Sequence, residues 1–224
     1  MVSTELKGKL RELALLIGAS LFGVCRIDDI RDNLHAEIKA CSEQMNTAIS
    51  IGVALSTGVM ETIDNRPNML YKAHYQQVNH TLNDIAMTVA SEINSNGGES
   101  IPIPASQIIT WKPMRAHLSH REIAGKAGLG WRGRNNLLVT EKYGSQIRLV
   151  TVLTDLELEP DNCTMQDCAE CYACLDACPV GAISKNVEDF NLESCYDQVQ
   201  RFSKQDNYGH LICGLCLKAC PGSG

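Results

Sequence analysis

Cysteines are the residues best suited to chemistry in this chain, and they are distributed unevenly. Nine of the 11 cysteines lie between Cys163 and Cys220. Residues 168–179 read CAECYACLDACP, with the spacing C-x2-C-x2-C-x3-C-P, and residues 213–221 read CGLCLKACP, which repeats the last part of that spacing. Such runs are typical of [4Fe–4S] ligation, in which the cysteine before proline reaches a neighbouring cluster. A structural zinc site needs only four ligands in paired units. The spacing therefore predicts two [4Fe–4S] clusters.

The second cluster lacks one expected ligand, because the chain has His210 where the repeated half of the motif should begin. An imidazole can replace a thiolate, but Cys195 lies upstream in a predicted helix and could fold back, so we favour Cys195. The predicted ligands are Cys168, Cys171, Cys174 and Cys220 for cluster one, and Cys178, Cys195, Cys213 and Cys216 for cluster two. No role is predicted for Cys25, Cys41 or Cys163.

Length and charge predict two domains with different surfaces. The chain has 224 residues, which suits one full domain at 1–160 and a small ferredoxin-like module at 161–224. Residues 161–224 hold 4 basic and 9 acidic side chains, which gives −5 of the total net charge of −6. Such a surface repels phosphate backbones and favours basic faces of protein redox partners.

The amino-terminal sequence predicts a cytoplasmic location. MVSTELKGKLREL is charged and amphipathic, unlike a secretory signal peptide, and no run approaches the roughly 18 apolar residues of a membrane span. We therefore expect no membrane association. Cytoplasmic thiols are kept reduced, so the clustered cysteines are expected to bind metal rather than form disulfides.

Apolar periodicity predicts the elements that must position these residues. Helices are predicted at residues 6–17, 71–93 and 117–126, and strands or extended segments at 21–27, 48–55 and 99–105. Residues 137–140 and 146–153 are predicted to form a hairpin joined by EKYGS. This alternation predicts an α/β or α+β sandwich.

A glycine-rich segment precedes the predicted hairpin, with Gly128, Gly130 and Gly133 around Trp131. Glycines at this density let the backbone approach a ligand closely. The segment lacks the context of a dinucleotide fingerprint and the lysine and hydroxyl pair of a phosphate loop. A tight turn that feeds a hairpin is the alternative.

The combination of AGLGWRGRNNLLVTEKYG, VLTDLELEPD and the cysteine run followed by VGAI resembles the cobalamin-dependent reductases, namely epoxyqueuosine reductase and the respiratory reductive dehalogenases. The resemblance covers residues 117–221, with a weaker echo at 71–82. It implies a nitroreductase-like domain that holds a base-off corrinoid (cobalamin) beside the nearer cluster. The corrinoid-lining positions that it implies are Gly128, Leu129, Gly130, Trp131, Gly133, Arg134, Asn135, Tyr143 and Gly144.

Two departures from the family bear on the substrate. Met114 stands near the position of the acidic proton donor of epoxyqueuosine reductase, and the chain ends at PGSG without that family's tRNA-gripping extension. The twin-arginine signal and insertions of the dehalogenases are also missing. We therefore do not expect tRNA as a partner. Tyr75, His117 and His120 are the candidates for proton transfer, since histidine titrates in the useful range.

These observations predict a cobalamin-dependent iron–sulfur oxidoreductase. Cluster two accepts electrons from a low-potential donor of the ferredoxin or flavodoxin type, and cluster one passes them to the corrinoid, which reduces a small-molecule substrate. The first alternative is an electron-transfer protein or reductive activator for another corrinoid protein. The second is a corrinoid-binding or trafficking protein.

Overall fold

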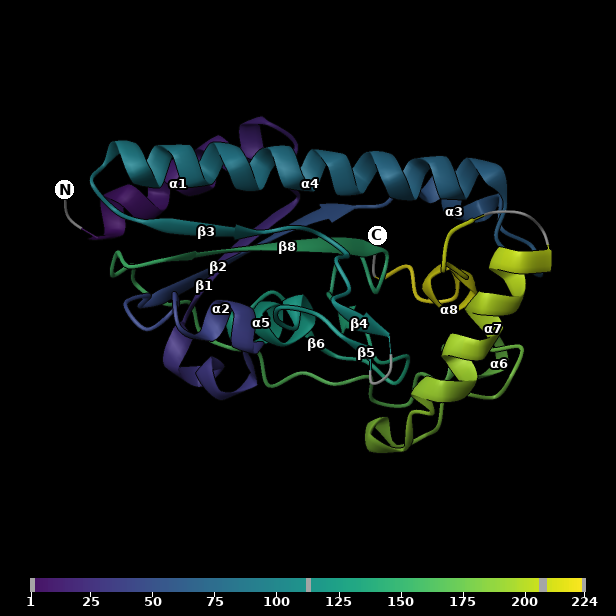
Figure 1. The fold of residues 1–224 in the computed structure, drawn as a ribbon. Coiled ribbons are helices and arrows are strands. Elements are labelled where there is room, and N and C mark those ends of the chain that lie inside the picture. Colours follow the sequence, from purple (N-terminus) through teal and green to yellow (C-terminus); the bar gives the residue numbers. More distant parts are fainter. Residues whose placement is uncertain (1–2, 112–113, 206–208, 223–224) are drawn as a thin grey trace. The chain divides into compact units, whose positions relative to one another are not determined.

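The computed structural model describes residues 3–111, 114–205 and 209–222 (Figure 1). The chain divides into two compact units. The first unit contains the residues up to Val53, Asn79–Leu129 and Arg148–Thr164, and the second contains Ala54–Val78, Gly130–Ile147 and the residues from Met165 on. Each unit is therefore built from separate segments, and the predicted boundary between residues 160 and 161 stays a prediction.

The first unit is built on a four-stranded sheet in the order β1-β2-β8-β3. The strands are β1 (Leu21–Arg26), β2 (Thr47–Ala54), β8 (Ile147–Thr154) and β3 (Ser100–Ile103). β1 is antiparallel to β2, and β3 is antiparallel to β8. The unit also contains the short pair β4 (Thr110–Trp111) and β5 (Met114–Arg115) and the 3-10 turns η1 (Ile27–Asp29) and η2 (Arg31–Asn33).

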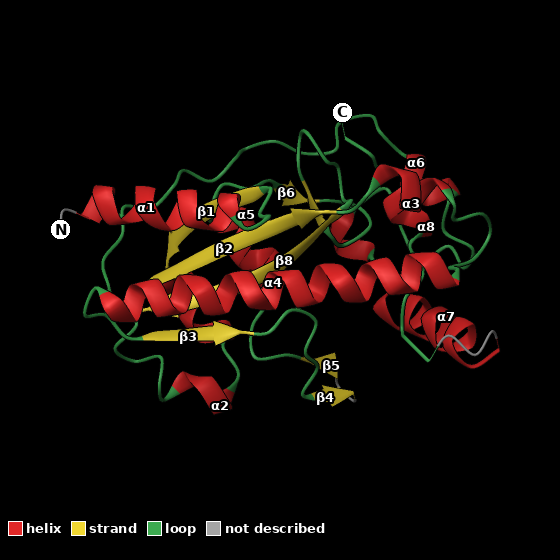
Figure 2. Ribbon diagram, turned by 90° about the horizontal axis from the view of Figure 1, so that it is seen from above, coloured by secondary structure: helices red, strands yellow, loops and turns green. Residues whose placement is uncertain are grey.

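Helices cover both faces of this sheet. α1 (Ser3–Leu16) and the long α4 (Met69–Ser95) run along one face (Figures 1 and 2), and α2 (Ala36–Lys39) and α5 (His120–Lys126) lie on the other (Figure 1). Leu82, Val89 and Ile93 of α4 are fully buried at helical spacing. On the other face, Ile123 and Leu153 belong to one buried cluster. The first unit is therefore a three-layer sandwich.

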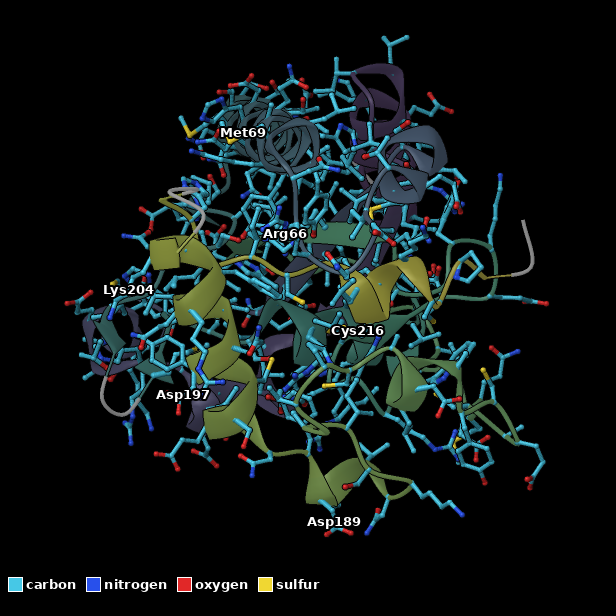
Figure 3. All side chains as sticks on the ribbon, turned by 90° about the vertical axis from the view of Figure 1, so that its right-hand side faces the viewer. Arg66, Met69, Asp189, Asp197, Lys204 and Cys216 are labelled. Carbon is cyan, nitrogen blue, oxygen red and sulfur yellow. The ribbon has the colours of Figure 1, made fainter. Side chains whose placement is uncertain are left out.

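The second unit consists of short elements joined by loops. It contains α3 (Thr57–Glu61), the start of α4, the paired strands β6 (Trp131–Arg132) and β7 (Leu138–Val139), α6 (Ala173–Asp176), η3 (Val187–Asp189), α7 (Leu192–Gln205) and α8 (Leu215–Lys218). α8 packs against α6 and α3. Asp189 and Asp197 are exposed (Figure 3), which places acidic side chains on the surface of this unit.

The predicted helices and strands agree with the structure, apart from the hairpin. β7 pairs with β6, and β8 lies between β2 and β3 in the sheet. A single bridge between Thr140 and Gly144 closes the turn that joins β7 to β8. β8 is buried along most of its length, so its backbone amides and carbonyls need partner strands on both sides, which a two-residue β7 cannot supply. Among the described residues, no helix is long and apolar enough to cross a membrane.

Candidate metal centre

All eight predicted cluster ligands belong to the second unit. In the first set, Cys168 and Cys171 precede α6, Cys174 lies within α6, and Cys220 follows α8. Burial raises the pKa of the Cys174 thiol to about 11, and the nearby sulfurs of Cys220, Cys168 and Cys171 add to this shift. These four sulfurs therefore lie within electrostatic reach of one another, as a shared cluster requires.

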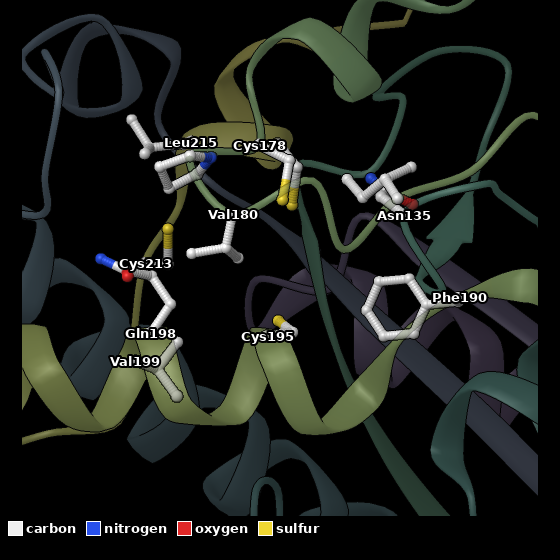
Figure 4. Close-up of a pocket in the computed structure, with 12 residues that line it drawn as sticks. Asn135, Cys178, Val180, Phe190, Cys195, Gln198, Val199, Cys213 and Leu215 are labelled. Carbon is white, nitrogen blue, oxygen red and sulfur yellow. The ribbon is translucent and has the colours of Figure 1, made fainter.

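The second set of cysteines lines one cavity (Figure 4). Cys178, Cys195, Cys213 and Cys216 reach this cavity from the loop after α6, from α7, from the loop before α8 and from α8. Its other walls are largely apolar, including Val180, Phe190 and Leu215. Burial raises the pKa of Cys213 to about 11 and that of Cys216 well above its ordinary value. The cavity thus presents four thiols in an apolar setting.

Cys195 reaches this cavity because Asn191 caps α7. The Asn191 side chain accepts a hydrogen bond from the Ser194 amide at 3.0 Å, and the Asn191 carbonyl accepts one from the Cys195 amide at 3.2 Å. His210 is not among the described residues that line the cavity. Its ring instead meets the edge of Tyr75, with a centroid separation of 6.2 Å. The placement supports Cys195 as the fourth ligand of this set.

Turns hold the ligand loops in place. The Ala182 amide donates a hydrogen bond to Cys178 Sγ at 3.3 Å. Gly214, at φ +87°, precedes α8, and a Cβ there would collide with Ile63 and Tyr71. Only glycine combines this left-handed backbone with such close packing. Within the described residues, no three His, Cys, Asp or Glu side chains are grouped to hold a single metal ion.

The glycine-rich segment is packed against the chain itself. A Cβ at Gly130 would collide with the Val139 carbonyl, and one at Gly133 would collide with the Val139 side chain. In the first unit, a Cβ at Gly128 would collide with the Asn162 carbonyl. The Cβ side of each of these glycines therefore faces the chain itself, and their predicted role in lining a corrinoid stays a prediction.

Arg134 was predicted to line the corrinoid, but it contacts the loop that carries the first cysteine set. Its guanidinium donates hydrogen bonds to the carbonyls of Ala169 at 2.8 Å, Cys171 at 2.9 Å and Lys185 at 2.7 Å. It also lies over the Tyr172 ring, 4.5 Å from the centroid. Ala169 has φ +40°, which a non-glycine residue rarely adopts. Arg134 thus stabilises a strained turn between two predicted ligands.

Gly144 and Asn135 also serve the cysteine loops. A Cβ at Gly144, at φ +52°, would collide with the backbone of Cys220 and Gly222. The buried Asn135 donates a hydrogen bond to Ser145 Oγ at 3.0 Å and lines the cavity of the second set. Ser145 was not predicted, and no local pattern marks it, because its partners lie far along the chain.

The other predicted corrinoid-lining residues are placed separately. Leu129 belongs to the first unit, where its side chain lies against Gly23. The Tyr143 amide donates to Thr140 Oγ1 at 3.0 Å, and Lys142 lies over the Tyr143 ring. Trp131 Nε1 is buried and has no hydrogen-bond partner among the described residues. An unpaired buried donor fits a ligand that carries amide carbonyls, as a corrinoid does.

The three candidates for proton transfer belong to different units, His117 and His120 to the first and Tyr75 to the second. Both ring nitrogens of His120 have partners, Thr151 Oγ1 at 2.8 Å and the Pro104 carbonyl at 3.2 Å. Burial lowers the pKa of His120 to about 4, so its ring is neutral near pH 7.

His117 differs from His120 in having one nitrogen without a partner. Its Nε2 lies 3.0 Å from Glu37 Oε2, and its buried Nδ1 has no partner among the described residues. Tyr75 packs edge-on to Tyr71 and His210.

Comparison with known proteins gives a consistent group of relatives. No family model matches the chain. An epoxyqueuosine reductase from Listeria monocytogenes is 42% identical over 112 residues, which cover 46% of this chain and 29% of that protein. A catabolic reductive dehalogenase has a similar fold, with a TM-score of 0.76 and 20% identity over 94% of this chain and 31% of the other. The chain thus spans less than a third of the length of that curated relative.

These comparisons confirm the predicted resemblance to the cobalamin-dependent reductase superfamily and the predicted fold class. The superfamily uses [4Fe–4S] clusters and cobalamin, as the cysteine motif and the resemblance predict.

The expectation that tRNA is not a partner was wrong. An epoxyqueuosine reductase whose structure contains an epoxyqueuosine-modified tRNA stem loop matches this fold with a TM-score of 0.61 and 21% identity over 85% of this chain and 55% of the other. The expectation rested on Met114, on the last residues of the chain and on the net charge of residues 161–224. Net charge averages over a surface and does not describe the local patch that a nucleic acid would contact.

Proposed function

We propose that this chain is a cobalamin-dependent iron–sulfur oxidoreductase in which two [4Fe–4S] clusters pass electrons to a corrinoid that reduces the substrate. The observation that carries this proposal is the placement of eight cysteines in one compact unit as two sets of four. The first set has the spacing C-x2-C-x2-C, and Cys220 completes it. The relatives are named as reductases, so the comparisons do not favour an electron-transfer or trafficking protein that lacks substrate turnover.

The residues of the chain have defined tasks in this proposal. When bound, the clusters carry single electrons and the corrinoid supplies a reducing cobalt centre. Eight thiolates would hold the iron, and Arg134 positions the loop of the first set through the carbonyls of Ala169 and Cys171 and ties it to the Lys185 carbonyl. His120 is neutral near pH 7 with both nitrogens in use. It therefore positions the strand and loop beside it rather than supplying a proton.

Anaerobic purification tests the cluster assignment. The protein should contain roughly eight iron and eight sulfide per chain, as two cubanes require. A content of roughly four iron, or stoichiometric zinc, would contradict two clusters. Titration with hydroxocobalamin should then show a base-off shift in absorption and EPR. If protein with full clusters shows no shift, the electron-carrier alternative replaces the proposal.

Turnover tests the reductase proposal itself. Reduced protein loaded with cobalamin should oxidise its clusters when the substrate is added. The substrates to compare are an epoxyqueuosine-modified tRNA stem loop, because a related reductase has been solved with one, and small halogenated aromatic compounds, because a related dehalogenase has been solved with 3-bromo-4-hydroxybenzoic acid. The electron donor should be of the ferredoxin or flavodoxin type. The predicted cytoplasmic location stays a prediction.

Trp131 offers a specific test of corrinoid binding. Trp131→Phe keeps an aromatic ring and removes the buried Nε1 donor. Loss of one hydrogen bond, worth about 1 kcal/mol, should weaken cobalamin binding roughly fivefold. The iron content should not change, because no thiolate is touched. Unchanged affinity would exclude Trp131 from the corrinoid site.

A further inference from the structure

Arg134 and Lys185 place two cations over one tyrosine of the second unit. The Arg134 guanidinium carbon lies 4.5 Å from the centroid of the Tyr172 ring, and Lys185 Nζ lies 5.6 Å from the same centroid. A cation within about 6 Å of an aromatic centroid is attracted by the ring. Tyr172 directly follows the predicted ligand Cys171 in the sequence. Both positive charges are therefore held beside the loop of the first cysteine set.

Hydrogen bonds bring the Arg134 charge against a predicted ligand residue. Arg134 Nη1 donates to the Cys171 carbonyl at 2.9 Å, and Nη2 donates to the Ala169 carbonyl at 2.8 Å. Nε donates to the Lys185 carbonyl at 2.7 Å, so each guanidinium nitrogen has an acceptor and the planar group is held in one place. The sulfur of a cysteine is joined to its own carbonyl through Cα and Cβ. The guanidinium therefore lies near the Cys171 sulfur whichever rotamer that side chain adopts.

Two carboxylates belong to the same ligand loop. Asp167 Oδ1 accepts a hydrogen bond from the Ala169 amide at 2.7 Å, and Glu170 Oε2 accepts one from the Tyr172 hydroxyl at 3.4 Å. Negative charges beside a cluster oppose the addition of an electron, and net charge is among the factors that set the reduction potential of a cluster. The two cations over the tyrosine offset these carboxylates.

We propose that Arg134 and Lys185 raise the reduction potential of cluster one, because their positive charges offset the carboxylates of its ligand loop. This inference rests on the proposed function, because it requires the cluster that Cys171 helps to hold. Reduction of that cluster adds one electron, which comes from the ferredoxin- or flavodoxin-type donor through cluster two, and it breaks no bond. A higher potential at cluster one favours the passage of the electron from cluster two to cluster one.

Lys185→Gln is the direct test, since it removes one charge and keeps the Lys185 carbonyl as an acceptor for Arg134. The measurement is made in a Cys195→Ala background, which should contain cluster one alone. Potentiometric titration followed by EPR should give one midpoint, and Lys185→Gln should make that midpoint more negative. If Cys195→Ala does not fold, the same change is measured in the wild-type background, where one of the two midpoints should move.

Two substitutions of Arg134 separate its charge from its hydrogen bonds. Arg134→Gln removes the charge and should shift the same midpoint further than Lys185→Gln does, because Arg134 contacts Cys171 directly. Loss of this charge should lower the ratio of reduced to oxidised cluster roughly threefold to tenfold at a fixed potential, and tenfold is about 59 mV for one electron. Arg134→Lys keeps the charge but not the planar group, so its midpoint should stay close to that of the unsubstituted protein.

Arg132→Gln is the matched control. Among the described residues, Arg132 donates hydrogen bonds to Glu188 at 3.0 Å and to Asn136 at 3.1 Å rather than to the cysteine loop, so the midpoint should not change.

The outcomes separate this inference from the proposed function. Unchanged midpoints in Lys185→Gln and Arg134→Gln, with iron retained, would overturn the inference while the proposed function stands. Equal shifts in Arg134→Gln and Arg134→Lys, with none in Lys185→Gln, would also overturn it, because the hydrogen bonds and not the charge would then set the potential. If Arg134→Gln loses its iron, the midpoint of Lys185→Gln decides alone. Wild-type protein without clusters would overturn the proposed function and this inference together.

Discussion

Replacing Gly144 with alanine tests the contact between the β7–β8 turn and the last cysteine loop. Gly144 has φ +52°, and a Cβ there would collide with the Cys220 carbonyl and the Gly222 amide. A left-handed backbone costs an L-residue about 1–2 kcal/mol, and overpacking a close contact costs about 1–3 kcal/mol more. We therefore expect Gly144→Ala to destabilise the protein by about 2–5 kcal/mol.

Gly181 provides the matched control because it separates the two costs. It has φ +60°, but a Cβ there would meet no atom within 4 Å. Gly181→Ala should therefore cost only the backbone term of about 1–2 kcal/mol. The assay is urea unfolding followed by the visible absorbance of the clusters, with iron counted per chain. Gly144→Ala should also lose iron toward roughly four per chain, because Cys220 is displaced. Equal stability and equal iron content in the two variants would refute the reasoning.

Two further predictions concern a ligand and a buried histidine. Cys195→Ala should retain roughly four iron per chain and His210→Ala roughly eight; iron analysis giving the opposite pattern would transfer the ligand role to His210. Because the pKa of His120 falls from 6.5 to about 4 in the folded chain, the unfolded chain takes up the proton first as the pH falls. The free energy of unfolding should therefore decrease by at most about 3 kcal/mol as the pH falls from about 6.5 to about 4. His120→Gln should remove that part of the pH dependence of the urea midpoint, and an unaltered slope would count against the assignment.

The grouping of Cys168, Cys171 and Cys174 could be predicted because motif spacing is local, whereas the full ligand sets stay a prediction. Motif spacing alone places three ligands of the first set near one another, and a capped helix after Asn191 brings Cys195 to the second. The role of the glycines could not be predicted this way. The Val139 carbonyl fills the space beside Gly130, and the Cys220 backbone fills the space beside Gly144. The spacing of the glycines predicts neither of these neighbours. The same limit explains the wrong hairpin, since strand partners are chosen by burial across the whole sheet.

Burial of the thiols has a consequence for protein that has lost its iron. The pKa of Cys174 and of Cys213 is raised to about 11, and that of Cys216 is raised well above its ordinary value. Metal binding must therefore displace protons from these sulfurs, and they take protons back when the iron leaves. A neutral thiol is a poor nucleophile and resists oxidation. The burial that opposes cluster loading thus protects the emptied Cys174, Cys213 and Cys216 from peroxide and from mispaired disulfides, so that oxidative damage should fall first on the exposed Cys41, Cys163 and Cys171.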